Sequence, residues 1–296
     1  MTAPSSFLRI AVLGTGMMGL PIARRLCQAG HQVHAWNRTR SKAELLVNDG
    51  AQVHEQAADA VRQADMAISL LESGPVVADV LFRQGVAEAL APGALFIDMA
   101  SIQPAEARAH AAQLMARGAA YLDAPVSGGT VGAEAGTLAI MVGGEATDFS
   151  RAQPVFAALG RATHVGPHGT GQLTKLANQM IVGITIGAVA EALLLCQAGG
   201  ADPAQVRAAI AGGFADSRIL QLHGQRMVER DFTRRAAMAV QLKDMRNALH
   251  TAAELGLQTP ITTLFEQLYA DGVAHGLADA DHSSLFLELA QRNGMA

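Results

Sequence analysis

A run of glycines near the start of the chain has the spacing of a phosphate-binding turn. It reads GTGMMG over residues 14–19, and it lies between the apolar stretch 8–13 and an amphipathic segment that ends at Gly30. In such a turn the first glycine makes the tight bend, the second lets the backbone approach a pyrophosphate, and the third lets the helix pack on the strand. The free N–H groups and the dipole of a helix N-terminus favour an anion there. The sequence therefore predicts a dinucleotide site that includes Gly14, Gly16, Met17, Met18 and Gly19.

The turn after the second predicted strand bears on the choice of cofactor. NAD-selective folds of this type usually carry Asp or Glu there, and that carboxylate binds the ribose 2′-hydroxyl. Here the residues are Asn37, Arg38 and Thr39, and the first carboxylate that follows is Glu44. Arg38 offers a planar guanidinium for a 2′-phosphate, with Asn37 and Thr39 as neutral donors. We therefore expect NADP, while NAD or dual use stays open because Arg38 could instead be solvated or stack on adenine.

Two later segments carry residues that suit a small carboxylate substrate. The loop 123–132 reads DAPVSGGTVG, and its backbone N–H groups and the Ser127 hydroxyl suit a carboxylate beyond the carboxyl end of a strand. Residues 169–178 read GTGQLTKLAN and lead into a long helix on which Lys175 and Asn178 share a face. A lysine near a helix N-terminus is disfavoured by the dipole, and burial lowers its pKa toward a value useful for proton transfer. Taken singly, these glycines could simply make turns and the lysine could be a solvated surface charge.

Short apolar runs alternate with helical patterns in the first half of the chain, which predicts a parallel sheet covered by helices. The runs are 8–13, 32–36, 66–71, 95–98, 120–123 and 139–142. After about Gly171 no strand run appears, and the helical patterns are 172–197, 203–211, 217–229, 236–255, 261–275 and 282–291. We predict an α/β fold with an N-terminal Rossmann-type doubly wound sheet at residues 1–168. A long interdomain helix would join it to an all-helical C-terminal domain at residues 169–296.

Composition argues against several classes of protein. The 296 residues carry a formal charge of −4 with 16% charged residues, which gives no general basic surface for nucleic acid. Cys27 and Cys196 lack C-x-x-C spacing, so we expect neither a disulfide nor a zinc site but core thiols in a reducing cytoplasm. His164 and His168 have metal-like spacing without a completing ligand, so we expect no metal and a structural role for both.

No targeting or membrane segment is expected from the sequence. Residues Met1–Ser6 lack the features of a signal peptide. The apolar run 180–190 is interrupted by Glu191, short of the roughly 20 residues that cross a bilayer, and so predicts a buried helix. Gly183 and Gly187 form a G-x-x-x-G pair on it, for which we favour close packing in a soluble core over a membrane dimer face.

Taken in order, these segments resemble the β-hydroxyacid dehydrogenase family, which includes 3-hydroxyisobutyrate dehydrogenase and tartronate semialdehyde reductase. The resemblance spans nearly the whole chain and rests on four motifs: residues 14–19, 123–132, 169–178, and Leu242-Lys243-Asp244 on a later helix. It implies a cytoplasmic oxidoreductase that transfers a hydride between a nicotinamide cofactor and a small 3-hydroxy acid or its semialdehyde. It also implies a homodimer or homotetramer.

The resemblance further implies a role for individual residues. Lys175 would be the general acid/base, Asn178 would help to orient the substrate, and Lys243 would close over the site from the helical domain. The substrate carboxylate would be held by Ser127, Gly128 and Gly129. The cofactor site would also include Leu70, Ser101 and Lys243.

Two other readings of the function remain. Imine reductases share this architecture, but they usually place Asp or Tyr where this chain has Lys175. A non-catalytic dinucleotide-binding module would be expected to lack the lysine. The substrate itself stays open among tartronate semialdehyde, 3-hydroxyisobutyrate, succinic semialdehyde, threonate and sulfolactaldehyde.

Overall fold

The computed structural model describes residues 7–295, so the expectation for residues Met1–Ser6 lies outside it. The chain divides into two compact units, Met1–Lys175 and Leu176–Ala296, called here the N-terminal and C-terminal units. The division into functional domains at residues 168 and 169 stays a prediction.

The N-terminal unit contains a nine-stranded sheet. Its strands are β1 (Arg9–Leu13), β2 (Gln32–Trp36), β3 (Gln52–Val53), β4 (Met66–Ser69), β5 (Leu95–Asp98), β6 (Ala120–Asp123), β7 (Val126–Ser127), β8 (Leu138–Gly144) and β9 (Gly160–Gly166). They lie in the order β3-β2-β1-β4-β5-β6-β8-β7, with β9 paired to β8. Because β1 is flanked by β2 on one side and β4 on the other, the strand order reverses beside β1, which is where doubly wound sheets bind ligands.

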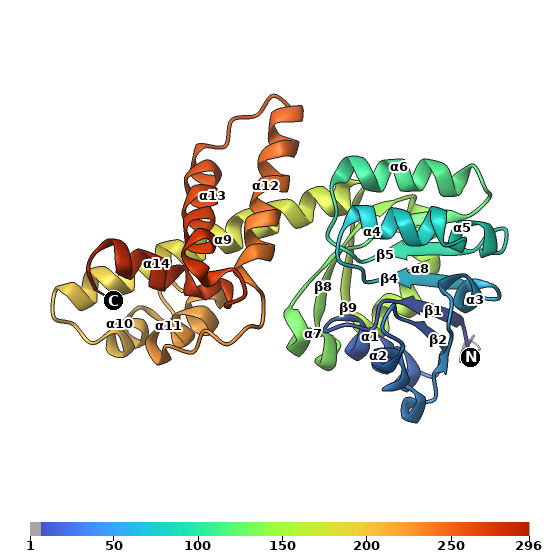
Figure 1. Ribbon diagram of the computed structural model, residues 1–296, viewed down its shortest axis with the longest axis horizontal. Coiled ribbons are helices and arrows are strands. Elements are labelled where there is room, and N and C mark those ends of the chain that lie inside the picture. Colours follow the sequence, from blue (N-terminus) through green and yellow to red (C-terminus); the bar gives the residue numbers. More distant parts are fainter. Residues whose placement is uncertain (1–6, 296) are drawn as a thin grey trace. The chain divides into compact units, whose positions relative to one another are not determined.

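Helices cover both faces of this sheet (Figure 1). The helical segments are α1 (Gly19–Gln28), α2 (Arg40–Glu44), η1 (Val47–Asp49), α3 (Ala57–Val61), α4 (Gly74–Ala78), η2 (Asp79–Arg83), α5 (Val86–Ala89), α6 (Pro104–Met115), α7 (Gly129–Ala135) and α8 (Ala146–Leu159). In β1, Ile10 and Val12 pack with α1 and α8, while Ala11 and Leu13 pack with the core of α3 to α6. A strand buried on both faces reads as a continuous apolar run, which is why the sequence revealed it.

The six predicted strands are present as β1, β2, β4, β5, β6 and β8. The expectation of a parallel sheet is confirmed for β1 to β6 but is wrong for β8, which runs antiparallel to β6 and β7. The physical reason is that β7 and β8 pair as a hairpin around α7, so the chain returns in the opposite direction.

The C-terminal unit is helical. Its helical segments are most of α9 (Thr170–Ala198), α10 (Pro203–Ile210), η3 (Leu220–Gly224), α11 (Gln225–Glu229), α12 (Met238–Glu254), α13 (Pro260–Gly272), η4 (Val273–Leu277), η5 (His282–Ser284) and α14 (Leu285–Arg292). Among its described residues the only β-type pairing is the isolated bridge between Ala237 and Asp281. The expectation of a helical second half is therefore confirmed.

The two glycines on α9 allow close packing inside the C-terminal unit, as expected. A Cβ on Gly183 would lie 2.6 Å from Gln241 Nε2, and a Cβ on Gly187 would lie 2.0 Å from Phe265 Cε1. The helix predicted at 172–197 is present as α9 with nearly the same bounds. By length and composition α9 would suffice to cross a membrane, but the core helix of a soluble protein meets the same criterion.

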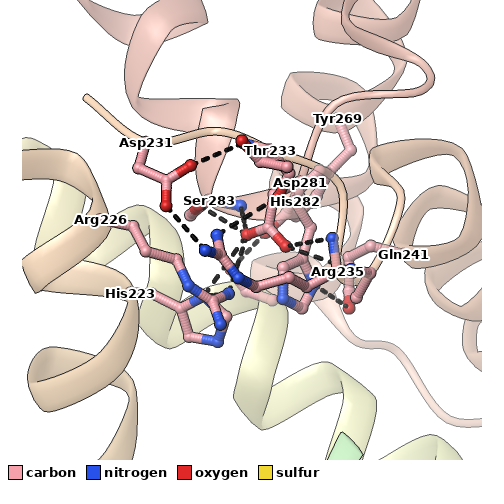
Figure 2. Close-up of polar contacts among 12 residues, drawn as sticks. His223, Arg226, Asp231, Thr233, Arg235, Gln241, Tyr269, Asp281, His282 and Ser283 are labelled. Carbon is pink, nitrogen blue, oxygen red and sulfur yellow. Dashed lines mark hydrogen bonds and ion pairs between the residues drawn. The ribbon is translucent and has the colours of Figure 1, made fainter. Parts of the chain in front are cut away.

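A buried carboxylate ties three segments of the C-terminal unit together (Figure 2). Asp281 is fully buried, and its Oδ1 accepts hydrogen bonds from Arg226 Nη1 at 3.1 Å and Ser283 Oγ at 2.6 Å. Its Oδ2 accepts from the backbone N–H groups of Arg235 and Ala236. Burial alone would raise the pKa of Asp281, but hydrogen bonds and nearby positive charge outweigh it and hold that pKa well below the usual range.

The same cluster brings potential metal ligands together, which the sequence analysis did not anticipate. Atoms of His223, Asp281 and His282 lie within 4.8 Å of one another. Arg226 Nη1, however, lies 3.2 Å from His223 Nδ1 as well as beside Asp281. Because the guanidinium already supplies the positive charge, the geometry favours a structural ion-pair core over a cation site.

Candidate active site

The glycine turn joins the carboxyl end of β1 to α1, at the point where the strand order reverses. Gly14 has a φ of +99°, and a Cβ there would lie 2.6 Å from the carbonyl oxygen of Leu70, the residue after β4. A Cβ on Gly19 would lie 1.8 Å from the carbonyl oxygen of Gly14. The fold itself therefore requires glycine at the first and third positions, as the spacing predicted.

The second glycine is different, because nothing in the protein requires it. A Cβ on Gly16 would meet no atom within 4 Å among the described residues. Its backbone is instead open at the N-terminal end of the ten-residue helix α1. This is the space that a pyrophosphate needs for close approach to the backbone and to the helix dipole, so the turn fits a dinucleotide.

The residues after β2 hold the glycine turn and present a cation. Asn37 Oδ1 accepts a hydrogen bond from the Thr15 N–H at 3.0 Å, and Asn37 Nδ2 donates to the Thr39 carbonyl at 2.9 Å. The amide of Asn37 therefore positions the turn, and its expected contact with the cofactor stays a prediction. Arg38 is exposed and has no ion pair within residues 7–295, whereas Arg40 pairs with both Glu44 and Glu55. Arg38 is thus a cation available to a phosphate.

Polar side chains end three neighbouring strands in register. Ser69, Asp98 and Asp123 are the last residues of β4, β5 and β6, and they pair across the sheet in that order. Asp98 accepts hydrogen bonds from Ser69 Oγ at 2.7 Å, from the Tyr121 hydroxyl at 3.1 Å and from the Ala100 N–H at 3.0 Å. Complete burial raises the pKa of Asp98 to about 6 in spite of these bonds. The sequence placed both aspartates at strand ends but did not identify this cluster.

The predicted substrate loop follows the end of β6. Ser127 is half-buried at the end of β7, and Gly128 and Gly129 are exposed, with φ values of +137° and +63°. A Cβ on Gly129 would meet nothing within 4 Å, whereas one on Gly128 would lie 3.1 Å from Leu138. Both positions favour glycine because their φ values are positive, and Gly129 also leaves space for a ligand.

The start of α9 is fixed against the ends of β5 and β6. Asp123 is fully buried, and its carboxylate accepts hydrogen bonds from the N–H groups of Gly169 at 2.7 Å and Gln172 at 2.9 Å. Burial raises the pKa of Asp123, although these two bonds oppose that shift. Lys175 lies half-buried, three residues after Gln172 on the same side of the helix. The general base predicted from the sequence is therefore borne on a helix anchored at the ligand-binding edge of the sheet.

In the C-terminal unit, Asn178 and Lys243 belong to one chain of polar contacts. Asn178 Nδ2 donates to Gln179 Oε1 at 2.9 Å, and Gln179 Nε2 donates to Asp244 Oδ2 at 2.8 Å. Asp244 is almost fully buried and its Oδ1 lies 3.1 Å from Lys243 Nζ. Sequence reasoning singled out the two ends of this chain and missed Gln179, whose only sequence signal is its place beside Asn178.

The two histidines considered as ligands each contact a backbone carbonyl. The Nε2 atoms of His164 and His168 lie 2.8 Å and 2.9 Å from the carbonyl oxygens of Gly144 and Tyr121. Cys27 and Cys196 are both free and half-buried, so they are less enclosed than the expected core thiols.

Comparison with known proteins assigns the chain to a family. The model for the NAD-binding domain of 6-phosphogluconate dehydrogenase matches residues 9–167, and that for the NAD-binding region of NADP-dependent 3-hydroxyisobutyrate dehydrogenase matches residues 169–289. A relative that spans nearly the whole chain, 2-hydroxy-3-oxopropionate reductase of Escherichia coli (strain K12), is 42% identical over 98% of this chain and 100% of its own length. The chain belongs to the β-hydroxyacid dehydrogenase family.

Two other members of this family are similar to this β-hydroxyacid dehydrogenase over nearly its whole length. The 3-hydroxyisobutyrate dehydrogenase of Pseudomonas aeruginosa is 36% identical over 93% of this chain and 95% of its own. The solved structure of Mycobacterium tuberculosis 3-hydroxyisobutyrate dehydrogenase with L-serine has a TM-score of 0.88 at 32% identity, covering 96% of this chain and 99% of that one. The protein is thus an enzyme, an NAD(P)-dependent hydroxyacid dehydrogenase with a nicotinamide-binding N-terminal sheet.

Proposed function

We propose that this enzyme transfers a hydride between NADP and a small 3-hydroxy acid or its semialdehyde, with Lys175 as the general acid/base. The observation that carries the proposal is the grouping at the carboxyl edge of the N-terminal sheet. The open turn at Gly16, the loop at Ser127 and the anchored start of the helix that bears Lys175 all follow strand ends at this edge. The relatives support this class of substrate, since their names refer to 2-hydroxy-3-oxopropionate and 3-hydroxyisobutyrate.

The chain's own residues deal with the carboxylate and the proton. When bound, a reduced nicotinamide would supply the hydride in the direction of reduction. Ser127 and the N–H groups of Gly128 and Gly129 hold the substrate carboxylate. Protonated Lys175 stabilises the negative charge that develops on the carbonyl oxygen and then donates its proton to that oxygen. In the direction of oxidation the neutral amine of Lys175 removes the hydroxyl proton.

The remaining residues orient the reactants. Asn178 donates to the substrate oxygen, and Lys243 supplies a positive charge to the bound ligands. Their shared contacts with Gln179 and Asp244 support this role, because the polar chain fixes both side chains in one arrangement. Ser101 lies in the loop after β5, from which it would contact the nicotinamide. Leu70, Met17 and Met18 line the cofactor site beside the glycine turn. Assembly as a homodimer or homotetramer in the cytoplasm remains a prediction.

The preference for NADP rests on Arg38. We expect Arg38→Ala to weaken NADPH binding by about 10- to 100-fold, the usual worth of a charge-assisted hydrogen bond, and to leave NADH binding nearly unchanged. The matched control is Arg40→Ala, which removes an exposed neighbouring arginine that is already paired with Glu44 and Glu55. Binding is measured by energy transfer from Trp36, the single tryptophan, whose carbonyl accepts from the Gly14 N–H at 2.8 Å. Equal losses for both cofactors would refute the proposed role of Arg38.

The reaction is tested by the absorbance of the reduced nicotinamide with NADPH and NADH, against a panel of semialdehydes and 3-hydroxy acids. Turnover that disappears in Lys175→Ala while Trp36 still reports cofactor binding supports the proposed function. Turnover of cyclic imines, with none on the acids, would assign the enzyme to imine reduction. Tight cofactor binding without turnover of the acids, the semialdehydes or the cyclic imines would indicate a non-catalytic binding module.

A further inference from the structure

One buried amide connects the helix that bears Lys175 to the loop that carries Ser101. Gln172 is completely buried, and its Nε2 donates to the Ala100 carbonyl at 2.7 Å while its Oε1 accepts from the Ile102 N–H at 3.1 Å. These two bonded backbone groups flank Ser101 on either side. A single side chain from α9 therefore fixes the backbone on both sides of Ser101.

The backbone of Gln172 is itself fixed. Its N–H donates to Asp123 at 2.9 Å, next to the bond from the Gly169 N–H. The chain before it has no room to shift, since a Cβ on Gly171 would lie 2.4 Å from the Asp123 carbonyl oxygen and 2.5 Å from that of Met141. The amide of Gln172 is thus held at a defined place relative to both β5 and β6.

Space filling alone does not explain a glutamine here. An apolar side chain of the same length would fill the site but would leave the Ala100 carbonyl and the Ile102 N–H without these partners in the interior. The amide carries one donor and one acceptor, and the structure uses each on one side of Ser101. Lys175 follows one helical turn later, so a shift at Gln172 is transmitted directly to it.

We propose that Gln172 is a positioning residue for the reaction, which sets the loop at Ser101 and the helix at Lys175 in a fixed mutual arrangement. This role rests on the proposed function, in which Ser101 contacts the nicotinamide and Lys175 moves the proton. Hydride and proton must reach neighbouring atoms of one carbonyl group, and a misplacement of about 1 Å can cost about 100-fold in rate. Gln172 sets that geometry without touching the reactants.

The first test replaces the amide by a side chain of similar length. In Gln172→Met we expect kcat to fall by about 10- to 100-fold, with the NADPH dissociation constant changed by less than about threefold. Deuterium at the transferred position of NADPH should give a larger isotope effect on kcat than in the wild type. A merely structural role would lower the folded fraction and leave the isotope effect unchanged. The matched control is Gln197→Met, the same change at an exposed position of α9.

The second test works even where the methionine variant fails to fold. In Gln172→Glu a protonated carboxyl group still donates to Ala100 and accepts from Ile102, whereas the ionised form repels the Ala100 carbonyl. Burial raises the pKa of such a carboxyl group. We therefore expect kcat of this variant to approach the wild-type value at low pH and to fall below it as pH rises, at temperatures where the variant remains folded.

The outcomes separate the two proposals. Wild-type kcat and isotope effect in Gln172→Met, or a Gln172→Glu profile that follows the wild type at every pH, would overturn the positioning role while the proposed function stands. A wild-type enzyme without turnover on the acid panel, or turnover that survives Lys175→Ala, refutes the proposed function and the positioning role with it.

Discussion

The buried carboxylate of Asp98 should make the stability of the N-terminal unit fall as pH rises. Its pKa lies at about 6 in the folded protein against 3.8 ordinarily, because burial penalises the charged form more than its three hydrogen bonds favour it. A group with a raised pKa in the folded state holds its proton there after the unfolded chain has released it. The contribution of Asp98 to the free energy of unfolding is therefore greatest below pH 3.8 and is lost as pH rises from there past about 6.

The magnitude follows from the two pKa values. Each tenfold difference in proton affinity is worth about 1.4 kcal/mol, so the full change is about 3 kcal/mol. About half of it, roughly 1–2 kcal/mol, falls between about pH 5 and about pH 7.5. The variant Asp98→Asn keeps the shape, and its oxygen still accepts from Ser69 and the Ala100 N–H. Its amide can donate to the Tyr121 hydroxyl oxygen, so the variant should lack this pH dependence.

The assay is urea unfolding of both proteins, followed by the fluorescence of Trp36, which is nearly buried and belongs to the N-terminal unit. The quantity of interest is the difference in free energy of unfolding, wild type minus Asp98→Asn, because other titrating groups cancel in it. That difference should fall by roughly 1–2 kcal/mol from about pH 5 to about pH 7.5. Asp59→Asn makes the same change at a surface ion pair and isolates the effect of burial. A difference that is constant with pH, or that rises with it, would show the reasoning to be wrong.

Three further predictions concern the glycine turn, the buried Asp281 and the packing of α9. Gly16→Ala should fold like the wild type and lose about tenfold or more in NADPH affinity, and unchanged affinity would refute phosphate binding by the open turn. Gly19→Ala should not fold, because its Cβ would lie 1.8 Å from a carbonyl oxygen. Asp281→Ala should lower the free energy of unfolding of the C-terminal unit by about 3–5 kcal/mol, measured in urea by circular dichroism. The reason is that partly buried Arg226 loses its ion pair and the N–H groups of Arg235 and Ala236 lose their acceptor, and a loss below about 1 kcal/mol would contradict it. Gly187→Ala should cost about 1–3 kcal/mol of stability in the same assay, and Phe265→Leu in the same chain should recover part of it if the 2.0 Å contact is the cause.

The strands that could be predicted are those whose burial gives a simple pattern of apolar residues in the sequence. β1, β4 and β5 are buried at nearly every position, so each appears as an apolar run with clear ends. β3 and β7 have two residues each, too few to make a pattern. β9 alternates half-buried and exposed positions and contains polar residues, because it lies at the margin of the sheet and takes its register from β8. The pattern of apolar residues does not depend on the direction of a strand, so the antiparallel direction of β8 could not be predicted from it.

The same division holds for the candidate site. The glycine turn could be predicted because steric necessity fixes the residue type at Gly14 and Gly19, while at Gly16 the space beside the backbone is open, as the proposed dinucleotide site requires. Asp98 and Asp123 carried a readable signal, since each ends an apolar run and neighbouring parallel strands end together. Gln172 carried none. A glutamine in the first turn of a helix looks like a solvated residue until the loop that it binds, some 70 positions earlier in the chain, is placed beside it.

The contacts along helix α9 support the proposed role of the buried amide of Gln172, which does not touch the reactants. Its first turn is held in the N-terminal unit by Asp123 and Gln172, while Gly183 and Gly187 bring its later turns against α12 and α13 in the C-terminal unit. Lys175 is the last residue of the first unit, so it lies just where one set of contacts gives way to the other. The contacts made just before Lys175 fix the distance from the lysine to the edge of the sheet. The bonds at the start of α9 therefore hold Lys175, the proposed proton donor, at a fixed place relative to the sheet, and we expect a variant that weakens them to impair the chemical step before it impairs binding.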